Sequence, residues 1–394
     1  MVPGIRDRER CSERIRWDCE LWPWYIHPMF RRTFLATPLA AAAAAAGETA
    51  ATRRVQATND GVALNPVEYA TLLQSLTVGL EPDSYCLGGV VAKLEQTVAT
   101  ALGKEMAVWL STGTLANHMA VRALAGDRRR VMVQHESHLF NDCGDCCQTL
   151  SGLHLVPLAP GKATFTVEDL EREAARGASG RVTVPIGAIQ IETPVRRKTG
   201  EAFDFGEVKR VSQWARQRGI GMHLDGARLY LAAAYSGVPV RQYADLFDTV
   251  YVSMYKYFNA ASGAVLAGPK SLLENLYHPR RMFGNGLHAV WPFAAVAQHY
   301  LEGFQERYGK AVAVSERVIE GLQADSRFAV TRVPNGTNIF QLRLKTGDAG
   351  ALHRRAREAG LVLAAPGQDG SFSVLVNETW GGATAEEILG RLGS

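Results

Sequence analysis

The sequence lacks a strong excess of charge of either sign. Lysine and arginine together number 43 and aspartate and glutamate 39, so the formal net charge is only +4. The first 54 residues, with nine arginines and six acidic residues, account for most of that excess. A nearly neutral body without a basic stripe does not have the electrostatic footprint of a nucleic-acid-binding protein. We therefore expect a small-molecule partner and no nucleic acid.

Cysteine is also sparse, and four of the six cysteines lie beyond the N-terminal stretch: Cys86, Cys143, Cys146 and Cys147. The spacing of Cys143 and Cys146 is CxxC, and His135 and His138 are close in sequence, so a zinc or redox site is one alternative. A structural zinc site would need a second ligand pair downstream, which is missing. We expect buried small thiols on a helix and no bound metal.

The sequence near its N-terminus has no apolar run of membrane-spanning length. The alanine-rich run at residues 34–46 is 13 residues long, whereas a spanning helix needs about 20. It follows residues 30–35 (FRRTFL), which resemble a twin-arginine export motif, and it ends in small residues suited to cleavage. We expect a leader with a twin-arginine signal peptide at residues 1–54 and export, to the periplasm. The alternatives are a packed alanine-rich helix and a cytoplasmic protein, and Met29 is a candidate start.

From about Asn59 onward, short apolar runs alternate with amphipathic stretches, which is typical of an α/β layer architecture. No internal repeat or long disordered linker is apparent. Because a single core rarely grows beyond about 250 to 300 residues, we expect a large domain at 55–300 and a small C-terminal α/β domain at 301–394.

The expected strands of the large domain are 107–110, 130–133, 186–191, 221–224, 249–253 and 264–267, and the expected helices are 115–125, 167–175, 205–218 and 269–277. A long apolar-periodic segment follows at 292–322. The C-terminal part is expected to alternate strand 337–344, helix 349–359, strand 371–376 and helix 384–392.

Residues 111–117 (STGTLAN) follow an expected strand and open an expected helix. The backbone N–H groups and hydroxyls of Thr112, Gly113 and Thr114 would therefore face an anion, which predicts a phosphate site. A turn rich in serine and threonine is also an ordinary helix N-cap, so the motif alone is weak evidence.

Residues 223–228 (HLDGAR) place a carboxylate and a guanidinium at the end of another apolar strand. Ligands bind at such carboxyl edges in open α/β sheets. Asp225 could be a helix N-cap. It could also keep a pyridinium nitrogen protonated, so that the ring withdraws electrons from a carbanion.

Lys256 follows the expected strand 249–253 and has aromatic neighbours. Apolar surroundings lower the pKa of a lysine and make its amine a nucleophile. Alone, it would be assigned as a snorkelling surface lysine. A phosphate site, a strand-end aspartate and a strand-end lysine in this order are the three contacts that pyridoxal 5'-phosphate requires.

These residues resemble the low-specificity L-threonine aldolase and aromatic amino acid β-eliminating lyase family over roughly residues 59–392. HLDGAR is close to the family signature, and Ser253 and Lys256 match its S-x-x-K spacing, although Tyr255 and Tyr257 depart from the usual small neighbours. The resemblance implies a pyridoxal phosphate enzyme of the aminotransferase-like fold type I, with a mixed, mostly parallel sheet in the large domain.

The resemblance also implies a role for each candidate residue. Lys256 would form the Schiff base, Asp225 would hold the ring nitrogen, and His138 would stack on the cofactor and relay the β-hydroxyl proton. The phosphate would be bound by Thr112, Gly113 and Thr114, with Ser253 a lesser candidate. Arg281 stands where the family has a basic residue reaching the phosphate of a neighbouring subunit, which implies a homodimer or homotetramer with shared active sites.

The substrate carboxylate is the point at which the sequence departs from the family. Arg228 would bind this carboxylate, or a cofactor oxygen, through its fork of donors. Asn59 stands in place of an N-terminal serine, and residues 373–377 in place of a second arginine; His288 also replaces a phosphate-reaching arginine. One arm of the carboxylate clamp is therefore missing, which weakens the case for threonine as the substrate.

The favoured hypothesis is a lyase of amino acid metabolism. It would cleave the Cα–Cβ bond of a β-hydroxy amino acid to glycine and an aldehyde, or eliminate a β-substituent. The alternatives are another pyridoxal phosphate reaction, such as transamination or racemisation, and an exported non-catalytic protein of the same fold. The presence of both Lys256 and Asp225 argues against a non-catalytic protein.

Overall fold

The computed structural model describes residues 54–393. The export motif and the expected cleavage positions therefore lie outside the described residues. Within residues 54–393, no helix combines the length and the apolar character needed to cross a membrane.

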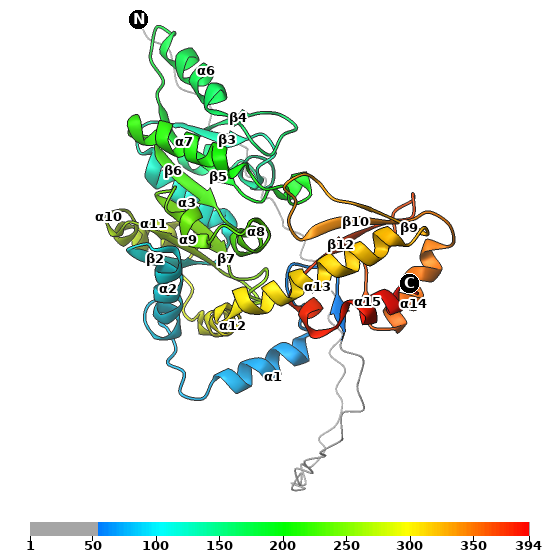
Figure 1. Ribbon diagram of the computed structural model, residues 1–394. Helices are drawn as coiled ribbons and strands as arrows, with labels where there is room; N and C mark the ends of the chain where they lie inside the picture. The colour runs from blue at the N-terminus through cyan, green and yellow to red at the C-terminus, as the bar shows by residue number, and fades with distance from the viewer. Residues whose placement is uncertain (1–53, 394) are drawn as a thin grey trace, which may run out of the picture. The chain divides into compact units, whose positions relative to one another are not determined.

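A seven-stranded sheet forms the centre of the N-terminal two thirds of the described chain, in the order β2-β8-β7-β6-β5-β3-β4 (Figure 1). Neighbouring strands from β7 to β4 are parallel, whereas β8 is antiparallel to both of its neighbours. The strands are β2 (Met106–Leu110), β3 (Arg130–Gln134), β4 (His154–Leu158), β5 (Ile186–Glu192), β6 (Gly221–Asp225), β7 (Thr249–Ser253) and β8 (Ala264–Gly268). The mixed, mostly parallel sheet that the sequence predicts is confirmed.

Of the seven-stranded sheet, β4 was not predicted, and elsewhere β1 (Val55–Gln56), β9 (Phe328–Thr331) and β11 (Leu361–Val362) were not predicted. Strand β4 lies at the edge of the sheet and contains Pro157 and the exposed His154, so its sequence lacks the continuous apolar run of a buried strand. A proline is tolerated at an edge because a donor on the outer side has no partner strand.

Helices cover both faces of this sheet. Helix α3 (Gly113–Ala125) contacts β5, β6 and β7, whereas α2 (Gly89–Leu102) packs against β2 and β8. The other helices of this part are α1 (Pro66–Leu76), α4 (His138–Asn141), α5 (Cys146–Ser151), α6 (Val167–Ala178), α7 (Phe205–Gln217), α8 (Leu229–Ser236), α9 (Val240–Ala244), α10 (Lys270–Leu273), α11 (Tyr277–Met282) and α12 (Trp291–Leu301).

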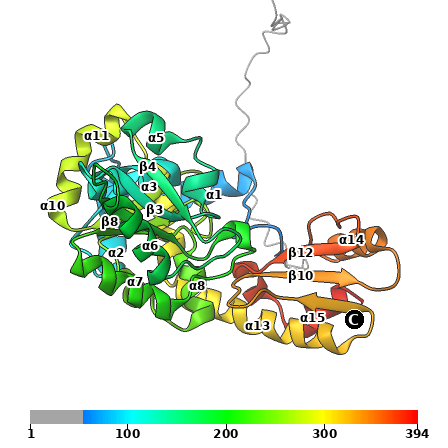
Figure 2. The same ribbon diagram turned by 90° about the horizontal axis from the view of Figure 1, so that it is seen from above.

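The C-terminal part has its own antiparallel sheet, in the order β12-β10-β9, with α13 and α15 on one side (Figure 2). A parallel pair, β1 with β11, ties the first described residues to this part. The elements are β1 (Val55–Gln56), α13 (Phe304–Ala324), β9 (Phe328–Thr331), β10 (Ile339–Leu344), α14 (Ala349–Glu358), β11 (Leu361–Val362), β12 (Ser371–Leu375) and α15 (Ala385–Arg391). The division at residue 300 into two domains stays a prediction.

The predicted helix 269–277 and the apolar-periodic segment 292–322 are each divided between two helices. The segment 269–277 contains α10, a short 3-10 turn at Glu274–Leu276 and the start of α11. Pro279, in α11, lacks the N–H that would bond to the carbonyl of residue 275. One continuous α-helix therefore cannot run from α10 into α11. The segment 292–322 likewise divides between α12 and α13 at Gly303, whose φ is +67°.

The expectation of buried thiols on a helix is confirmed for some of the cysteines. Cys146 and Cys147 lie in α5, and Cys147 and Cys143 are buried, but Cys143 lies in the turn before the helix.

Candidate active site

A cavity of about 850 Å³ opens where β5, β6 and β7 end. Because these strands are parallel, their carboxyl ends meet at one edge of the sheet and place polar residues side by side. The polar and aromatic residues lining it include Asn59, Asp60, His138, Glu192, Arg196, Asp225, Arg228, Tyr251, Tyr255 and Lys256.

Asp225, at the end of β6, is held by buried hydrogen bonds and is only 1% exposed. Its Oδ2 accepts from the Nδ2 of Asn117 at 2.7 Å, and its Oδ1 accepts from the backbone N–H of Ala227 at 3.1 Å. Burial lowers the pKa of His223 to about 4, so this imidazole is neutral. Since Asn117 donates to Asp225, its Oδ1 accepts from the Nε2 of His223 at 2.9 Å, and the Thr249 hydroxyl then donates to the Nδ1. The carboxylate orientation is thus fixed by a chain of polar side chains.

Lys256 lies in the loop after β7 and is half-buried. Burial, followed by the positive charge of Arg228, lowers the pKa of Lys256 to about 8. The next two residues, Tyr257 and Phe258, are buried and pack on Tyr230 and Phe304 with ring-centroid distances of 5.1–6.1 Å. This aromatic packing anchors the lysine loop, which explains the large residue Tyr257 beside Lys256.

Arg228 is engaged by an acidic residue that the sequence did not single out. Its Nε donates to the Oδ2 of Asp60 at 2.8 Å, and the Nδ2 of Asn338 donates to the Oδ1 of Asp60 at 3.1 Å. Asn59 does reach the cavity, where its carbonyl accepts from the Nδ2 of Asn377 at 2.9 Å. A Cβ on Gly61 would lie 2.4 Å from the carbonyl oxygen of Lys256, so this segment lies directly against the lysine loop.

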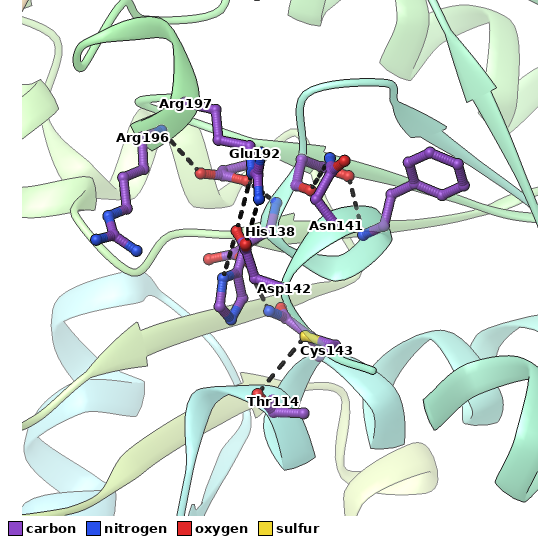
Figure 3. Close-up of polar contacts among 12 residues, drawn as sticks. Thr114, His138, Asn141, Asp142, Cys143, Glu192, Arg196 and Arg197 are labelled. Atoms are coloured by element: carbon purple, nitrogen blue, oxygen red, sulfur yellow. Dashed lines mark hydrogen bonds and ion pairs between the residues drawn. The ribbon is translucent and has the colours of Figure 1, made fainter. Parts of the chain in front are cut away.

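His138 begins α4 and is held through its backbone by Glu192 (Figure 3). The Oε2 of Glu192 accepts from the N–H of His138 at 2.6 Å, and its Oε1 accepts from the N–H of Arg196 at 3.0 Å. The hydrogen bond with Cys143 raises the pKa of His138, and Asp142 lies 3.4 Å from its Nδ1.

Glu192 itself was missed, because the predicted strand stops at Ile191, one residue short of it. Its side chain is buried, and this burial, with the negative charge of Asp225, raises its pKa to about 7. A glutamate directly after a predicted apolar strand was the signal in the sequence that could have identified it.

The predicted phosphate-binding residues Thr112, Gly113 and Thr114 lie at the start of α3 and are not among the residues that line the cavity. Thr112 is the N-cap and accepts from the N–H of Leu115 at 3.1 Å, while the Oγ1 of Thr114 is 3.6 Å from the Sγ of Cys143. A Cβ on Gly113 would lie 2.1 Å from the hydroxyl of Tyr251, which lines the cavity.

Ser253 adds a buried hydroxyl that makes no hydrogen bond of good geometry within residues 54–393. A native buried hydroxyl of this kind calls for a ligand or water. With the N-terminus of α3, which packs against β7, it fits a phosphorylated group.

Arg281 does not line the cavity within the described chain. It lies on α11, is exposed, and donates to the hydroxyl of Tyr277 at 2.8 Å. Its guanidinium also lies 5.0 Å from the ring centroid of Tyr85.

Comparison with known proteins gives a family match. Residues 70–345 match the family model described as "Beta-eliminating lyase". Among curated proteins, the low specificity L-threonine aldolase of Saccharomyces cerevisiae is 30% identical over 207 residues, covering 52% of this chain and 53% of the relative. The alanine racemase TOXG of Cochliobolus carbonum is 29% identical over 230 residues, covering 58% and 57%. The chain thus spans little more than half the length of these relatives.

A solved structure extends the likeness over most of the chain. The putative aromatic amino acid β-eliminating lyase/threonine aldolase of Exiguobacterium sp. 255-15 superposes with a TM-score of 0.72 at 25% identity, covering 87% of this chain and 96% of that one. The expected fold type is therefore confirmed.

Proposed function

Because this chain belongs to the β-eliminating lyase family, we propose that it is a pyridoxal phosphate-dependent lyase that cleaves the Cα–Cβ bond of β-hydroxy amino acids to give glycine and an aldehyde. The observation that carries the proposal is that Lys256, Asp225, His138 and Arg228 line one cavity. The named activity of the yeast relative supports this choice of reaction. Elimination of a β-substituent remains within the proposal, since it begins from the same bound substrate.

The cofactor would be held by residues already in place. Lys256 offers an amine of lowered pKa for covalent attachment, and Asp225 offers a fixed carboxylate to a protonated ring nitrogen. Thr112, Gly113, Thr114 and Ser253 would receive the phosphate. When bound, pyridoxal phosphate supplies a carbonyl that joins the substrate amine and a ring that withdraws electrons from the bond to be broken.

The chain's own residues would orient the substrate and move its proton. Arg228, fixed at its Nε by Asp60, has its terminal nitrogens left to bind the substrate carboxylate. His138 in its neutral form would accept the β-hydroxyl proton as the Cα–Cβ bond breaks. Glu192 holds the backbone of His138 and so sets where the imidazole enters the cavity.

The test is to incubate the cofactor-loaded protein with threonine and, separately, with an amino donor and a 2-oxo acid. We expect acetaldehyde and glycine from the first mixture and no new amino acid from the second. Transfer of the amino group without release of aldehyde would reject the lyase and establish transamination.

Racemisation is a second candidate, favoured by the similarity to an alanine racemase. Incubation of the same preparation with L-alanine and chiral analysis of the product tests it. Formation of D-alanine faster than aldehyde release from threonine would replace the lyase proposal.

We further propose that the protein forms a homodimer or a homotetramer with shared active sites. Supporting this, the apolar side chains Tyr85, Leu87, Met282 and Leu287 are exposed, and the Arg281 guanidinium lies 5.0 Å from the ring centroid of Tyr85. The segments that carry them are joined by the backbone hydrogen bond from Tyr85 to His288. Exposed apolar side chains together with an arginine are typical of a protein interface.

We also propose export by the twin-arginine route, on the sequence of residues 30–46 alone. N-terminal sequencing of protein recovered from the periplasm should show cleavage after the alanine run. A mature protein that still begins at Met1 would reject the proposal.

A further inference from the structure

The cavity holds a second guanidinium that the proposed mechanism does not use. Arg196 belongs to a 3-10 turn (Arg196–Lys198) that follows β5. It lines both the 850 Å³ cavity and an adjoining cavity of about 430 Å³, and Arg228 lines both as well. The two arginines, which are 32 positions apart in sequence, therefore line the same two cavities.

The position of Arg196 is fixed through its backbone. Its N–H donates to the Oε1 of the buried Glu192 at 3.0 Å, and the preceding Val195 is fully buried and pairs with Glu201. Figure 3 shows the side chain of Arg196 turned away from Asp142, whereas Arg197 reaches Asp142 and pairs with it at 2.6 Å. The turn thus directs two consecutive arginines to different places.

The charged side chains around the cavity leave that of Arg196 without a partner among the described residues. Arg228 is paired with Asp60, Lys256 is close to Asp225, and both oxygens of Glu192 accept from backbone N–H groups. The side chain of Arg196, in contrast, makes no hydrogen bond or ion pair with any residue of the described chain. An amino acid that enters this space brings a carboxylate, and an arginine fork is suited to receive it.

The C-terminal sheet contributes no cation at this place. Its residues on the adjoining cavity are Ile339, Gln341, Ser373 and Leu375, all uncharged. A carboxylate that docks at Arg228 would also lie near the negative charge of Asp60, so Arg228 alone offers little net attraction. A second cation lining the same cavities would offset this repulsion.

We propose that Arg196 binds the substrate α-carboxylate together with Arg228. The carboxylate site is then built from the ends of β5 and β6, and the late C-terminal strand supplies only polar and apolar wall. This inference rests on the proposed function insofar as the ligand is an α-amino acid.

Equilibrium binding measurements test the carboxylate site without requiring that the protein catalyse a reaction. Calorimetric titration of the cofactor-loaded protein with glycine and with glycinamide, which lacks the carboxylate, measures the preference for the charge. Arg196→Gln should weaken glycine binding about tenfold, which corresponds to about 1.4 kcal/mol, and leave glycinamide binding unchanged. Arg196→Lys should recover part of the loss.

Lys198→Gln is the matched control, because it removes one positive charge from the same turn without touching either cavity. It should bind glycine as the unmodified protein does. Equal weakening in Lys198→Gln and Arg196→Gln would show a general field effect and overturn the direct contact.

A steady-state kinetic experiment compares threonine and β-hydroxyaspartate as substrates. Arg196→Gln should raise the KM of both about tenfold, with a smaller change in kcat. An increase confined to β-hydroxyaspartate would place Arg196 at the side-chain carboxylate and overturn the inference. If the unmodified protein prefers glycine through Arg196 but releases no aldehyde from threonine, the lyase proposal fails and the carboxylate site stands.

Discussion

Lys256 has a perturbed pKa, and this property of a single residue can be tested by experiment. Its pKa is lowered to about 8 by burial and by Arg228, while an ordinary lysine has a pKa near 10.4. Only the unprotonated amine attaches to an aldehyde. The reactive fraction of Lys256 therefore rises with pH up to about 8 and then levels off.

We predict that covalent attachment of pyridoxal phosphate to the cofactor-stripped protein follows this profile. The initial rate, measured by growth of the visible absorbance band, should rise about tenfold per pH unit below pH 8 and become constant above it. Lys256→Ala should give no band at any pH. A rate that still climbs at pH 9 to 10 would mean that the lysine is not perturbed.

Asp225 gives a second prediction at this scale. Asp225→Ala should retain the cofactor through Lys256 but lose turnover by about two orders of magnitude, a typical cost of removing a catalytic electrostatic group. Asn117→Ala should give a smaller loss, since it removes the 2.7 Å bond that orients the carboxylate and the bond from His223 but leaves the carboxylate itself in place. Unchanged turnover in Asp225→Ala would show that another residue faces the ring nitrogen.

At the scale of elements, the start of α3 requires a residue without a side chain. A Cβ on Gly113 would lie 2.1 Å from the hydroxyl oxygen and 2.6 Å from the Cζ of Tyr251, which is buried and cannot move aside. The helix start would have to shift away from the phosphate position.

Gly113→Ala should therefore weaken pyridoxal phosphate binding at least about tenfold and destabilise the fold by about 1–3 kcal/mol, the usual cost of overpacking. Gly309→Ala is the control, because Gly309 lies exposed inside α13 with open space around it. That variant should gain about 0.5–1 kcal/mol of stability from helix propensity. Fluorescence titration and thermal unfolding measure both effects. Normal cofactor affinity in Gly113→Ala would remove α3 from the phosphate site.

At the scale of the whole molecule, the proposed assembly makes a prediction about subunit number. Met282 is 80% exposed and adjoins Arg281 in sequence, whereas Val182 is 78% exposed elsewhere, between α6 and β5. Met282→Asp should yield monomers and Val182→Asp should not. Light scattering coupled to size-exclusion chromatography distinguishes these outcomes, and assembly that survives Met282→Asp would place the interface on another surface.

Part of the fold and of the site follows from the sequence by itself, because it depends on neighbouring residues. The central buried strands were predicted to within one residue at each end since their apolar runs are continuous, and the motifs at 111–117 and 223–228 lie where strands end. Asp225 and Lys256 reach one cavity because parallel strands end at a common edge. The edge strand β4, whose pattern is interrupted, was not found this way.

Only the tertiary structure decided how distant residues pair. Asp60 and Arg228 are 168 positions apart and meet because β1 pairs with β11 and Asn338 and Asn377 hold the intervening segment. Glu192, at the end of β5, accepts hydrogen bonds from the backbone N–H groups of both His138 and Arg196, which belong to different segments of the chain. Local periodicity encodes burial and hydrogen bonding within an element, whereas the partner of a charged side chain depends on strand order and loop paths. For this reason the sequence identified the residues that carry the chemistry, whereas the tertiary packing determined which charged residues lie next to them.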